Sequence, residues 1–336
     1  MSAKDLSILI PARNEIWLAK TVEDILSNIE MDTEIIVVLD GGWADPAIPQ
    51  HERVNVVYLP KAIGQRAATN LACKLSKATY VMKTDAHCAF DKGFDRKLIA
   101  RMEPDCVMVP VMRNLHVFSW KCNKCGSYED HYQGPTPITG GAKALQACVK
   151  CGNKEAGTFE KIVIWNAKER PQSTSYSFDS EPHFQYFNEY KKSNRYRRQL
   201  KNGLTESMSI QGSCFLLTRK AYWELNVSDE SWGSWGSQGI EVAGKFWLSG
   251  GRVLINHDTW YGHLFRTQGG DFGFPYEHNN DGNHKAMARK LFFEGKWDKQ
   301  VRPLSWLVER FWPITPSGEN RGWTQEELNK LKANNN

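Results

Sequence analysis

The sequence lacks several features that would assign it to a familiar class at once. No apolar run approaches the roughly 20 residues that a transmembrane helix needs, so we expect no membrane partner. The first residues, MSAKDLSILIPARNE, have one lysine before a short apolar run that ends in Pro11, unlike a secretory signal. The dinucleotide pattern G-x-G-x-x-G and the P-loop pattern are both absent. We therefore expect a cytoplasmic protein that binds any nucleotide through polar side chains and a metal.

The composition is that of an ordinary globular protein. The 336 residues, 41% apolar and 24% charged, suffice for one large domain or two modest ones. Four of the eight cysteines form two C-x-x-C pairs. The other four are scattered singly, which favours reduced thiols over a disulfide framework. The net charge of +5 is compatible with a polyanionic partner without requiring one, and oligomeric state stays open.

The first third of the chain alternates strand and helix patterns. Strands are predicted at 6–12, 34–42, 53–60 and 80–87, and helices at 16–29 and 64–77. This order predicts an α/β fold with a mainly parallel, twisted sheet covered by helices. Ligands of such sheets bind beyond the carboxyl ends of the strands. Arg13, Asn14, Asp40, Asp85 and His87 all lie at the carboxyl ends of predicted strands.

Two of these strand ends carry groups that suit a nucleotide or a metal. Asp40 could accept a hydrogen bond from a base or ribose, or it could be a turn residue before two glycines. Asp85 and His87 are two apart, so at an extended strand end they point to the same side. A carboxylate and an imidazole suit Mn²⁺ or a similar cation. The alternative for Asp85 and His87 is a capped turn.

The motifs of the chain resemble those of family-2-type glycosyltransferases with the GT-A fold. The resemblance is closest to the polypeptide N-acetylgalactosaminyltransferases, whose corresponding strand ends in Asp-x-His-Cys. Here the same strand ends in YVMKTDAHC. Four further segments are similar to that family and follow in its order: QGSCFLLTRKAYWEL (211–225), WGSQGIEVAGKFWLSGG (235–251), GHLFR (262–266) and FPYEHNNDGNHKAMARKLFFEGKW (274–297). Together they cover roughly residues 6 to 120 and 205 to 297.

The resemblance implies a set of site residues. It implies that Asp85, His87 and His263 bind Mn²⁺ or Mg²⁺, which stabilises the charge on departing UDP. Arg266 would contact the pyrophosphate, and Tyr276 would assist from a loop with glycines at 269, 270 and 273. The implied contacts to the nucleotide sugar comprise Pro11, Arg13, Asn14, Asp40, Arg66, Asp85, Arg266 and Tyr276.

The chain departs from that family at the expected acceptor side. Gln238 stands where the family has a glutamate, and Gly239 replaces an asparagine, whereas Glu241 matches. A glutamine can hydrogen-bond a sugar or an acceptor but cannot take its proton. Gln238, Glu241 and Arg266 are the expected catalytic residues, with Gln238 and Glu241 lining the sugar and acceptor pocket. The resemblance implies a retaining reaction in which the departing diphosphate activates the acceptor, and the substitution leaves this stereochemistry open.

A cysteine module interrupts the resemblance. CNKC (122–125) and CVKC (148–151) each place two thiols on one turn, each is followed by glycine, and together they can form a tetrahedral site. We expect a structural Zn²⁺ at Cys122, Cys125, Cys148 and Cys151, with redox use as the minor alternative. Four thiolates close the coordination shell, so this ion would not be catalytic.

A segment beyond the module mixes aromatic and basic residues. YFNEYKKSNRYRRQLKNG (186–203) could track a phosphate backbone and stack on unpaired bases. It could equally be a solvated helix face with tyrosines packed beneath it.

The sequence thus predicts one GT-A domain with a zinc-ribbon-like insertion. Its predicted parts are a nucleotide-sugar half (1–120), the zinc insertion (121–160), an acceptor half (161–297) and a tail (298–336) with a Thr324–Glu327 capping box. We expect transfer from a UDP-sugar to a hydroxyl of a large acceptor, first a hydroxymethylated DNA base. The alternatives are a protein Ser/Thr hydroxyl and a non-catalytic zinc-ribbon protein that binds nucleic acid.

Overall fold

A computed structural model describes residues 4–128, 131, 147–155, 159–265, 283–315 and 321–333. The predicted elements of the first third are all present, with ends shifted by a few residues. The strands are β1 Leu6–Ala12, β2 Thr33–Asp40, β3 Val54–Leu59 and β4 Tyr80–Thr84, and the helices are α1 Leu18–Asn28 and α2 Gln65–Leu75. The fourth strand is shorter than predicted, because Asp85 to His87 form a bend.

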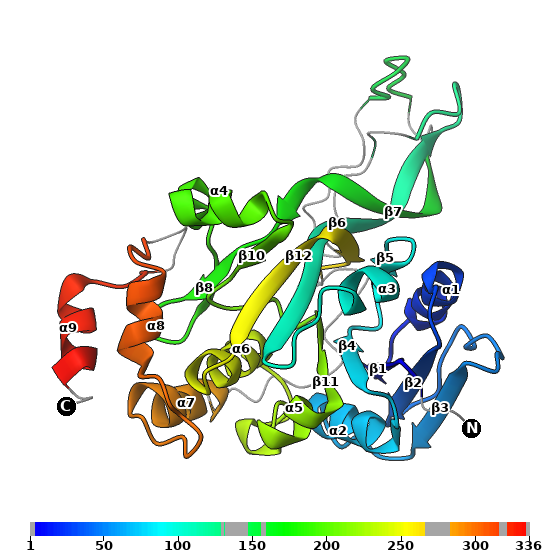
Figure 1. Ribbon diagram of the computed structural model, residues 1–336. Coiled ribbons are helices and arrows are strands. Elements are labelled where there is room, and N and C mark those ends of the chain that lie inside the picture. The colour runs from blue at the N-terminus through cyan, green and yellow to red at the C-terminus, as the bar shows by residue number, and fades with distance from the viewer. Residues whose placement is uncertain are drawn as a thin grey trace.

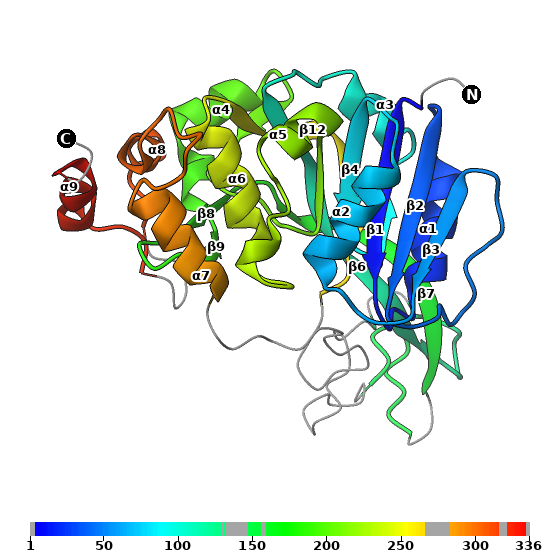
Figure 2. The same ribbon diagram turned by 90° about the horizontal axis from the view of Figure 1, so that it is seen from below.

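These strands form the parallel half of the sheet. β1 pairs with β2 and β4 in parallel, and β3 pairs with β2 in parallel at the edge. The residues of β1 and most of β2 are buried, because α2 packs against both strands on one face (Figure 2). The mixed α/β fold with a mainly parallel, curled sheet is confirmed.

The second half of the chain extends the same sheet. Its elements are β5 Cys88–Phe90, α3 Phe94–Ile99, β6 Cys106–Cys122, β10 Leu204–Glu206, β11 Cys214–Thr218, α5 Arg219–Glu224, α6 Gln238–Leu248 and β12 Arg252–His263. Within the described residues the main strand order is β10-β12-β6-β11-β4-β1-β2-β3. The antiparallel strand β11 joins β4 to β6, and β12 runs parallel to β6. All residues of α6 are buried, so this helix is part of the core.

A long two-stranded arm projects from the sheet. β6 continues past the body and pairs antiparallel with β7 Phe159–Ser173, whose first residue lies opposite Cys122. Both strands run through the predicted module boundaries at 120 and 160. Figure 1 shows this arm rising from the body, with the described cysteine segments at its far end.

The remaining elements lie mainly on the side of the molecule away from β1, β2 and β3 (Figure 1). They are β8 Tyr176–Phe178, β9 Phe184–Tyr186, the 3-10 helices Glu189–Lys192 and Glu230–Trp232, α4 Asn194–Leu200, α7 Asn283–Ala288, the π-helix Arg289–Phe293, α8 Leu304–Arg310 and α9 Gln325–Ala333. The capping box before α9 is formed: Glu327 Oε2 accepts from Thr324 N at 2.8 Å, and Thr324 Oγ1 accepts from Glu327 N at 3.2 Å. No helix in the described ranges is long and apolar enough to cross a membrane.

Candidate active site

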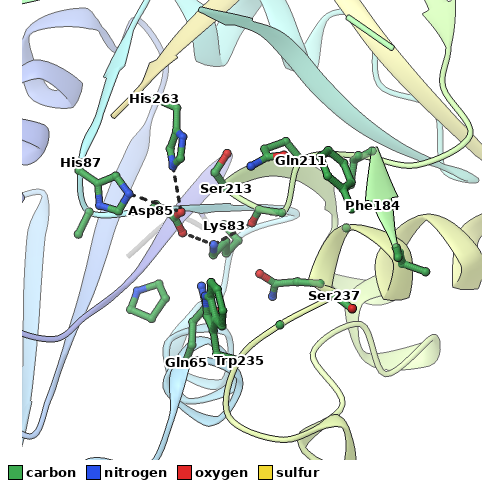
Figure 3. A pocket seen from close by; sticks show the side chains of 18 of the residues that line it. Gln65, Lys83, Asp85, His87, Phe184, Gln211, Ser213, Trp235, Ser237 and His263 are labelled. Carbon is green, nitrogen blue, oxygen red and sulfur yellow. Dashed lines mark hydrogen bonds and ion pairs between the residues drawn. The ribbon is translucent and has the colours of Figure 1, made fainter. Parts of the chain in front are cut away.

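A cavity of about 480 Å³ opens at the carboxyl ends of the parallel strands. Its floor contains Asp85 and His87, which follow β4, and His263, which ends β12 (Figure 3). The opposite wall carries Phe184 from β9 and Gln238 from the start of α6. The cavity therefore joins the two halves of the sheet, which the sequence analysis treated as separate donor and acceptor parts.

The three predicted metal ligands converge on one point. One donor atom from each of Asp85, His87 and His263 lies within 4.8 Å of the others. Asp85 Oδ2 is 3.3 Å from His263 Nε2 and 3.8 Å from His87 Nε2. One carboxylate and two imidazoles leave coordination positions open, which suits Mn²⁺ or a similar cation that also binds phosphate oxygens. The residues present fit a divalent cation.

The electrostatics of the cluster keep its donors in their metal-binding forms. Burial lowers the pKa of both His87 and His263 to about 4, against the opposing effect of Asp85. Burial alone would raise the pKa of Asp85, but the Lys83 ammonium, a His263 hydrogen bond and charge on the histidines outweigh it. That pKa therefore lies well below its usual range. At neutral pH the cluster is one carboxylate beside two neutral imidazoles.

Two charged neighbours of the cluster were missed from the sequence. Glu15 Oε2 lies 3.3 Å from His87 Nδ1, so it orients the ring with Nε2 toward Asp85. The Lys83 ammonium contacts Asp85 Oδ1 and donates to the Gly212 carbonyl at 2.8 Å, and its side chain is almost fully buried. The two oxygens of Asp85 are thus divided, one toward lysine and one toward the histidines (Figure 3). The sequence did contain a signal for Lys83: residues two apart in a strand point to the same face, so Lys83 and Asp85 could have been expected to lie together.

The start of α6 forms one wall of the cavity, and its tight packing accounts for the glycine at position 239. Gln238 lines the cavity, and its Nε2 is 3.5 Å from Ser228 Oγ. A Cβ added at Gly239 would lie 1.8 Å from the Ile210 carbonyl oxygen, so a side chain there requires this segment to move. Gly239 therefore allows α6 to approach the 210–212 strand connection, which lines the same cavity.

The prediction that Glu241 lines the cavity is wrong. Glu241 is completely buried behind the wall: Arg66 Nε donates to its Oε2 at 2.9 Å, and Lys245 Nζ to its Oε1 at 2.9 Å. The Asp229 amide also donates to Oε1 at 2.8 Å. Arg66 was predicted to contact the nucleotide. Its guanidinium instead pairs with Glu241 and donates to the carbonyls of Gly233 and Gly236. Arg66 and Glu241 therefore hold the loop that precedes α6, and they affect the cavity indirectly, by positioning this loop.

The other predicted nucleotide contacts surround the cavity at different depths. Pro11 lines it directly. Asp40 is fully buried, and its carboxylate accepts hydrogen bonds from the amides of Ile63 and Gly64 at 2.6 and 2.9 Å, as a turn residue would. Arg13 is half-buried and Asn14 exposed; neither is among the described residues that line the cavity. Arg266 and Tyr276 lie outside the described residues, as do the glycines at 269, 270 and 273.

The four cysteines of the module also come together. Sγ of Cys122 lies 3.8 Å from that of Cys151, and Sγ of Cys125 lies 3.5 Å from that of Cys148. All four sulfurs lie within 4.8 Å of one another. Sulfurs bound at about 2.3 Å to a tetrahedral Zn²⁺ would be about 3.8 Å apart, so the residues present fit zinc.

The two halves of this module are built alike. After each C-x-x-C pair a glycine has a positive φ, +71° at Gly126 and +70° at Gly152, and its amide donates to the carbonyl of the first cysteine at 2.8 Å. His131 joins the halves: its Nδ1 is 2.7 Å from the Trp120 carbonyl, and its Nε2 accepts from Val149 N at 3.2 Å. Because it is fully buried between the knuckles, His131 is a positioning residue that the sequence analysis did not identify.

The aromatic residues of segment 186–203 mostly pack inward. Phe187, Tyr190 and Tyr196 are at most 6% exposed, and only Tyr186 is exposed among the four. The prediction that this segment stacks bases on its aromatics is therefore wrong for three of them. The alternative, a basic surface over packed rings, is what the structure shows.

Comparison with known proteins agrees with this geometry. Residues 7–123 match the family model Glycosyl transferase family 2. Polypeptide N-acetylgalactosaminyltransferase 3 of Mus musculus is 24% identical over 275 residues, 78% of this chain and 37% of the mouse protein. The Homo sapiens protein of the same name is 23% identical, over 91% of this chain and 48% of its own length. The chain thus spans less than half the length of these relatives.

The fold has a counterpart among solved structures. The crystal structure of GalNAc-T7 with UDP, GalNAc and Mn²⁺ superposes with a TM-score of 0.55 at 17% identity, covering 87% of this chain and 48% of that one. This likeness shows that the chain has the GT-A fold.

Proposed function

We propose that this protein is a metal-dependent glycosyltransferase that moves a sugar from a UDP-sugar to a hydroxyl on a large acceptor. The observation that carries the proposal is the convergence of Asp85, His87 and His263 on the floor of a cavity at the carboxyl ends of parallel strands. The family 2 domain and the GT-A fold support the same reaction class, as does a neighbour solved with UDP and Mn²⁺.

The residues of the site would divide the work as follows. Asp85 Oδ2 and the Nε2 atoms of His87 and His263 would hold Mn²⁺ or Mg²⁺, which neutralises charge on the departing diphosphate when bound. Glu15 orients His87, and Lys83 fixes the second carboxylate oxygen of Asp85. Gln238 would donate or accept a hydrogen bond at the sugar or acceptor hydroxyl. Because Gln238 cannot take a proton, the acceptor proton would pass to the leaving diphosphate in a retaining reaction.

Two acceptor classes follow from different observations. The polypeptide transferases among the relatives favour a protein Ser or Thr hydroxyl. The basic surface over segment 186–203 and the knuckled cysteine module favour a hydroxymethylated base of DNA, which would have to flip out of a duplex to enter the cavity. We take the DNA base as the leading acceptor, and a cytoplasmic location, predicted from the sequence, fits it.

We further propose that the four-cysteine cluster binds a structural Zn²⁺. With four thiolates the shell is closed, so this ion would hold the tip of the arm and take no part in transfer.

UDP release from a panel of UDP-sugars tests the enzyme proposal. Reactions contain Mn²⁺ or EDTA, with duplex DNA carrying 5-hydroxymethyl bases or with Ser/Thr peptides, and Asp85→Ala is run beside the wild type. We expect release that requires metal and Asp85 and rises with DNA. Stimulation by peptides alone would assign a protein acceptor. Absence of turnover with every donor would contradict the enzyme proposal and favour a zinc-dependent nucleic-acid-binding protein.

A further inference from the structure

The positive charge of this protein is concentrated in one part of the chain. Residues 121–203 contain 14 Lys or Arg and 8 Asp or Glu, a formal net charge of +6. The whole chain carries +5, so the remaining residues are together close to neutral. Segregation of charge of this kind is an electrostatic footprint for an anionic partner.

The described parts of this segment follow one path, from the tip of the arm to α4. The cysteine module lies at the far end of the arm, and β7 runs from there back toward the body (Figure 1). At the other end Lys191 Nζ donates to the Gln172 carbonyl of β7, which places the segment leading into α4 beside that strand. We call nine of the exposed cations along this path the basic ridge: Lys121, Lys124, Lys150, Lys154, Arg170, Lys192, Arg197, Arg198 and Lys201.

Among the residues that the structure describes, most cations of the basic ridge have no acidic partner. Lys192 is the one that pairs with an acidic residue of the described ranges, Glu189 at 2.8 Å. Lysines elsewhere on the surface do find partners, such as Lys97 with Asp91 at 2.6 Å. The field of the ridge therefore extends into solvent, where it can attract an anion before contact.

The base of the arm, formed by β6 and β7, lies beside the end of β12 that carries His263. His263 lies opposite Asn114 of β6, and a Cβ added at Gly262 would lie 2.8 Å from the Cβ of Ala167 on β7. From Asn114 the strand continues eight residues to Cys122, a span of about 26 Å at roughly 3.3 Å per residue. That span corresponds to about 8 base pairs at 3.4 Å each.

We propose that the basic ridge binds the phosphate backbone of a nucleic acid and leads it to the cavity. This inference rests on the proposed function for the reaction that follows docking. The exposed cations are spread along the path and outnumber the exposed carboxylates Glu155, Glu160 and Glu169 on the arm. An elongated arrangement matches a linear polyanion better than a compact anionic ligand, which would need converging groups. The exposed rings of Tyr128 and Tyr186 add flat surface on which an unpaired base can stack.

Binding of a fluorescent 30-base-pair DNA duplex, followed by anisotropy from 50 to 200 mM NaCl, tests the ridge. One variant carries Lys124→Glu, Lys150→Glu and Lys154→Glu on the arm, and a second carries Arg197→Glu, Arg198→Glu and Lys201→Glu on α4. The matched control carries Lys74→Glu, Lys77→Glu and Lys220→Glu, three exposed lysines on the α2 and α5 side with the same charge change. Zinc content is measured for each protein, and the α4 variant keeps the test valid if the arm variant loses zinc.

We expect each ridge variant to raise the Kd at least tenfold and to make the log–log salt dependence shallower by up to about 3, since each phosphate contact contributes about 0.9. The control should change the Kd less than threefold. Equal weakening by the control, or no binding by the wild type at 50 mM NaCl, would overturn the proposal. Displacement by poly-glutamate at the same charge concentration would assign the ridge to an acidic protein instead.

UDP and Mn²⁺ binding, measured on the same variants, separates the two proposals. Ridge-dependent DNA binding without any UDP binding would refute the transferase and retain the ridge. UDP binding in every variant, combined with no DNA binding by the wild type, would refute the ridge proposal and retain the transferase proposal.

Discussion

Asp85 lies at the centre of the charged and titratable groups of the site. Its Oδ1 contacts the Lys83 ammonium and its Oδ2 faces both histidines, so a lysine and a metal would share one carboxylate. The buried ammonium opposes binding of a cation while favouring an anionic donor. The Lys83 charge is therefore expected to lower the affinity for the metal and to raise the affinity for the UDP-sugar. A substitution of Lys83 can test both effects.

For Lys83→Met we expect tighter Mn²⁺ binding, by about tenfold, because the repulsion between two cations is removed. Affinity for the UDP-sugar should fall, because the same ammonium attracts the diphosphate. Titration by electron paramagnetic resonance gives the first quantity and calorimetry the second. Lys77→Met, at an exposed position, serves as the control. Weaker Mn²⁺ binding in Lys83→Met would show that the lysine mainly orients Asp85.

Glu15 acts on the metal through His87. Because its carboxylate contacts the ring nitrogen that faces away from Asp85, Glu15→Ala should remove the hydrogen bond that orients the imidazole. Loss of such a partner typically costs 10- to 100-fold in metal affinity. We expect that loss in a Mn²⁺ titration, with Glu23→Ala, an exposed change on α1, remaining at the wild-type value. Unchanged affinity in Glu15→Ala would assign Glu15 another role.

At the scale of elements, helix α6 both lines the cavity and contributes to the stability of the fold. Its first residue, Gln238, lines the cavity, whereas one turn later Glu241 pairs with Arg66 of α2 and with Lys245. The helix is thereby fixed to α2 by a buried charge cluster, and Gly239 brings it against the 210–212 connection.

Glu241→Gln should therefore destabilise the fold by about 3 kcal/mol or more, because it leaves two buried cations without their carboxylate. Urea unfolding of the purified protein measures this loss. The control is Glu224→Gln on α5, an exposed residue whose pair with Lys220 is worth little. Wild-type stability combined with lost turnover would instead support a direct catalytic role for Glu241.

At the scale of the whole molecule, the arm and the body are held by different interactions. The body has a continuous apolar core that includes β1, β2, β4, β11 and α6. The tip of the arm depends on four cysteines and the bridge made by His131.

We expect Cys148→Ser to lose about one zinc per chain and to disorder the tip while the body keeps its fold and its Mn²⁺ binding. Zinc content, hydrogen exchange and a Mn²⁺ titration measure these three outcomes. Cys106→Ser changes a buried cysteine outside the cluster and should retain zinc. Collapse of the whole fold in Cys148→Ser would show that the module stabilises the body as well.

The sequence by itself determined the elements whose signals are local. β-branched strand runs, helical spacing, the capping box at Thr324 and the two C-x-x-C-Gly turns depend on neighbours a few residues apart, and each is formed. The spacing of Asp85 and His87 already suggested a metal site, whereas His263, 176 positions after His87, could be named only because ordered motifs resembled a family.

Only the tertiary structure decided which charges face the cavity. Glu241 and Lys83 are both charged residues in apolar surroundings, yet the first is sealed in an ion cluster and the second touches Asp85 in the cavity. Likewise, Tyr190 and Tyr196 of segment 186–203 are buried in the core, whereas Tyr186 is exposed. Burial and pairing of a side chain depend on partners supplied by distant segments, and local sequence patterns do not specify those partners.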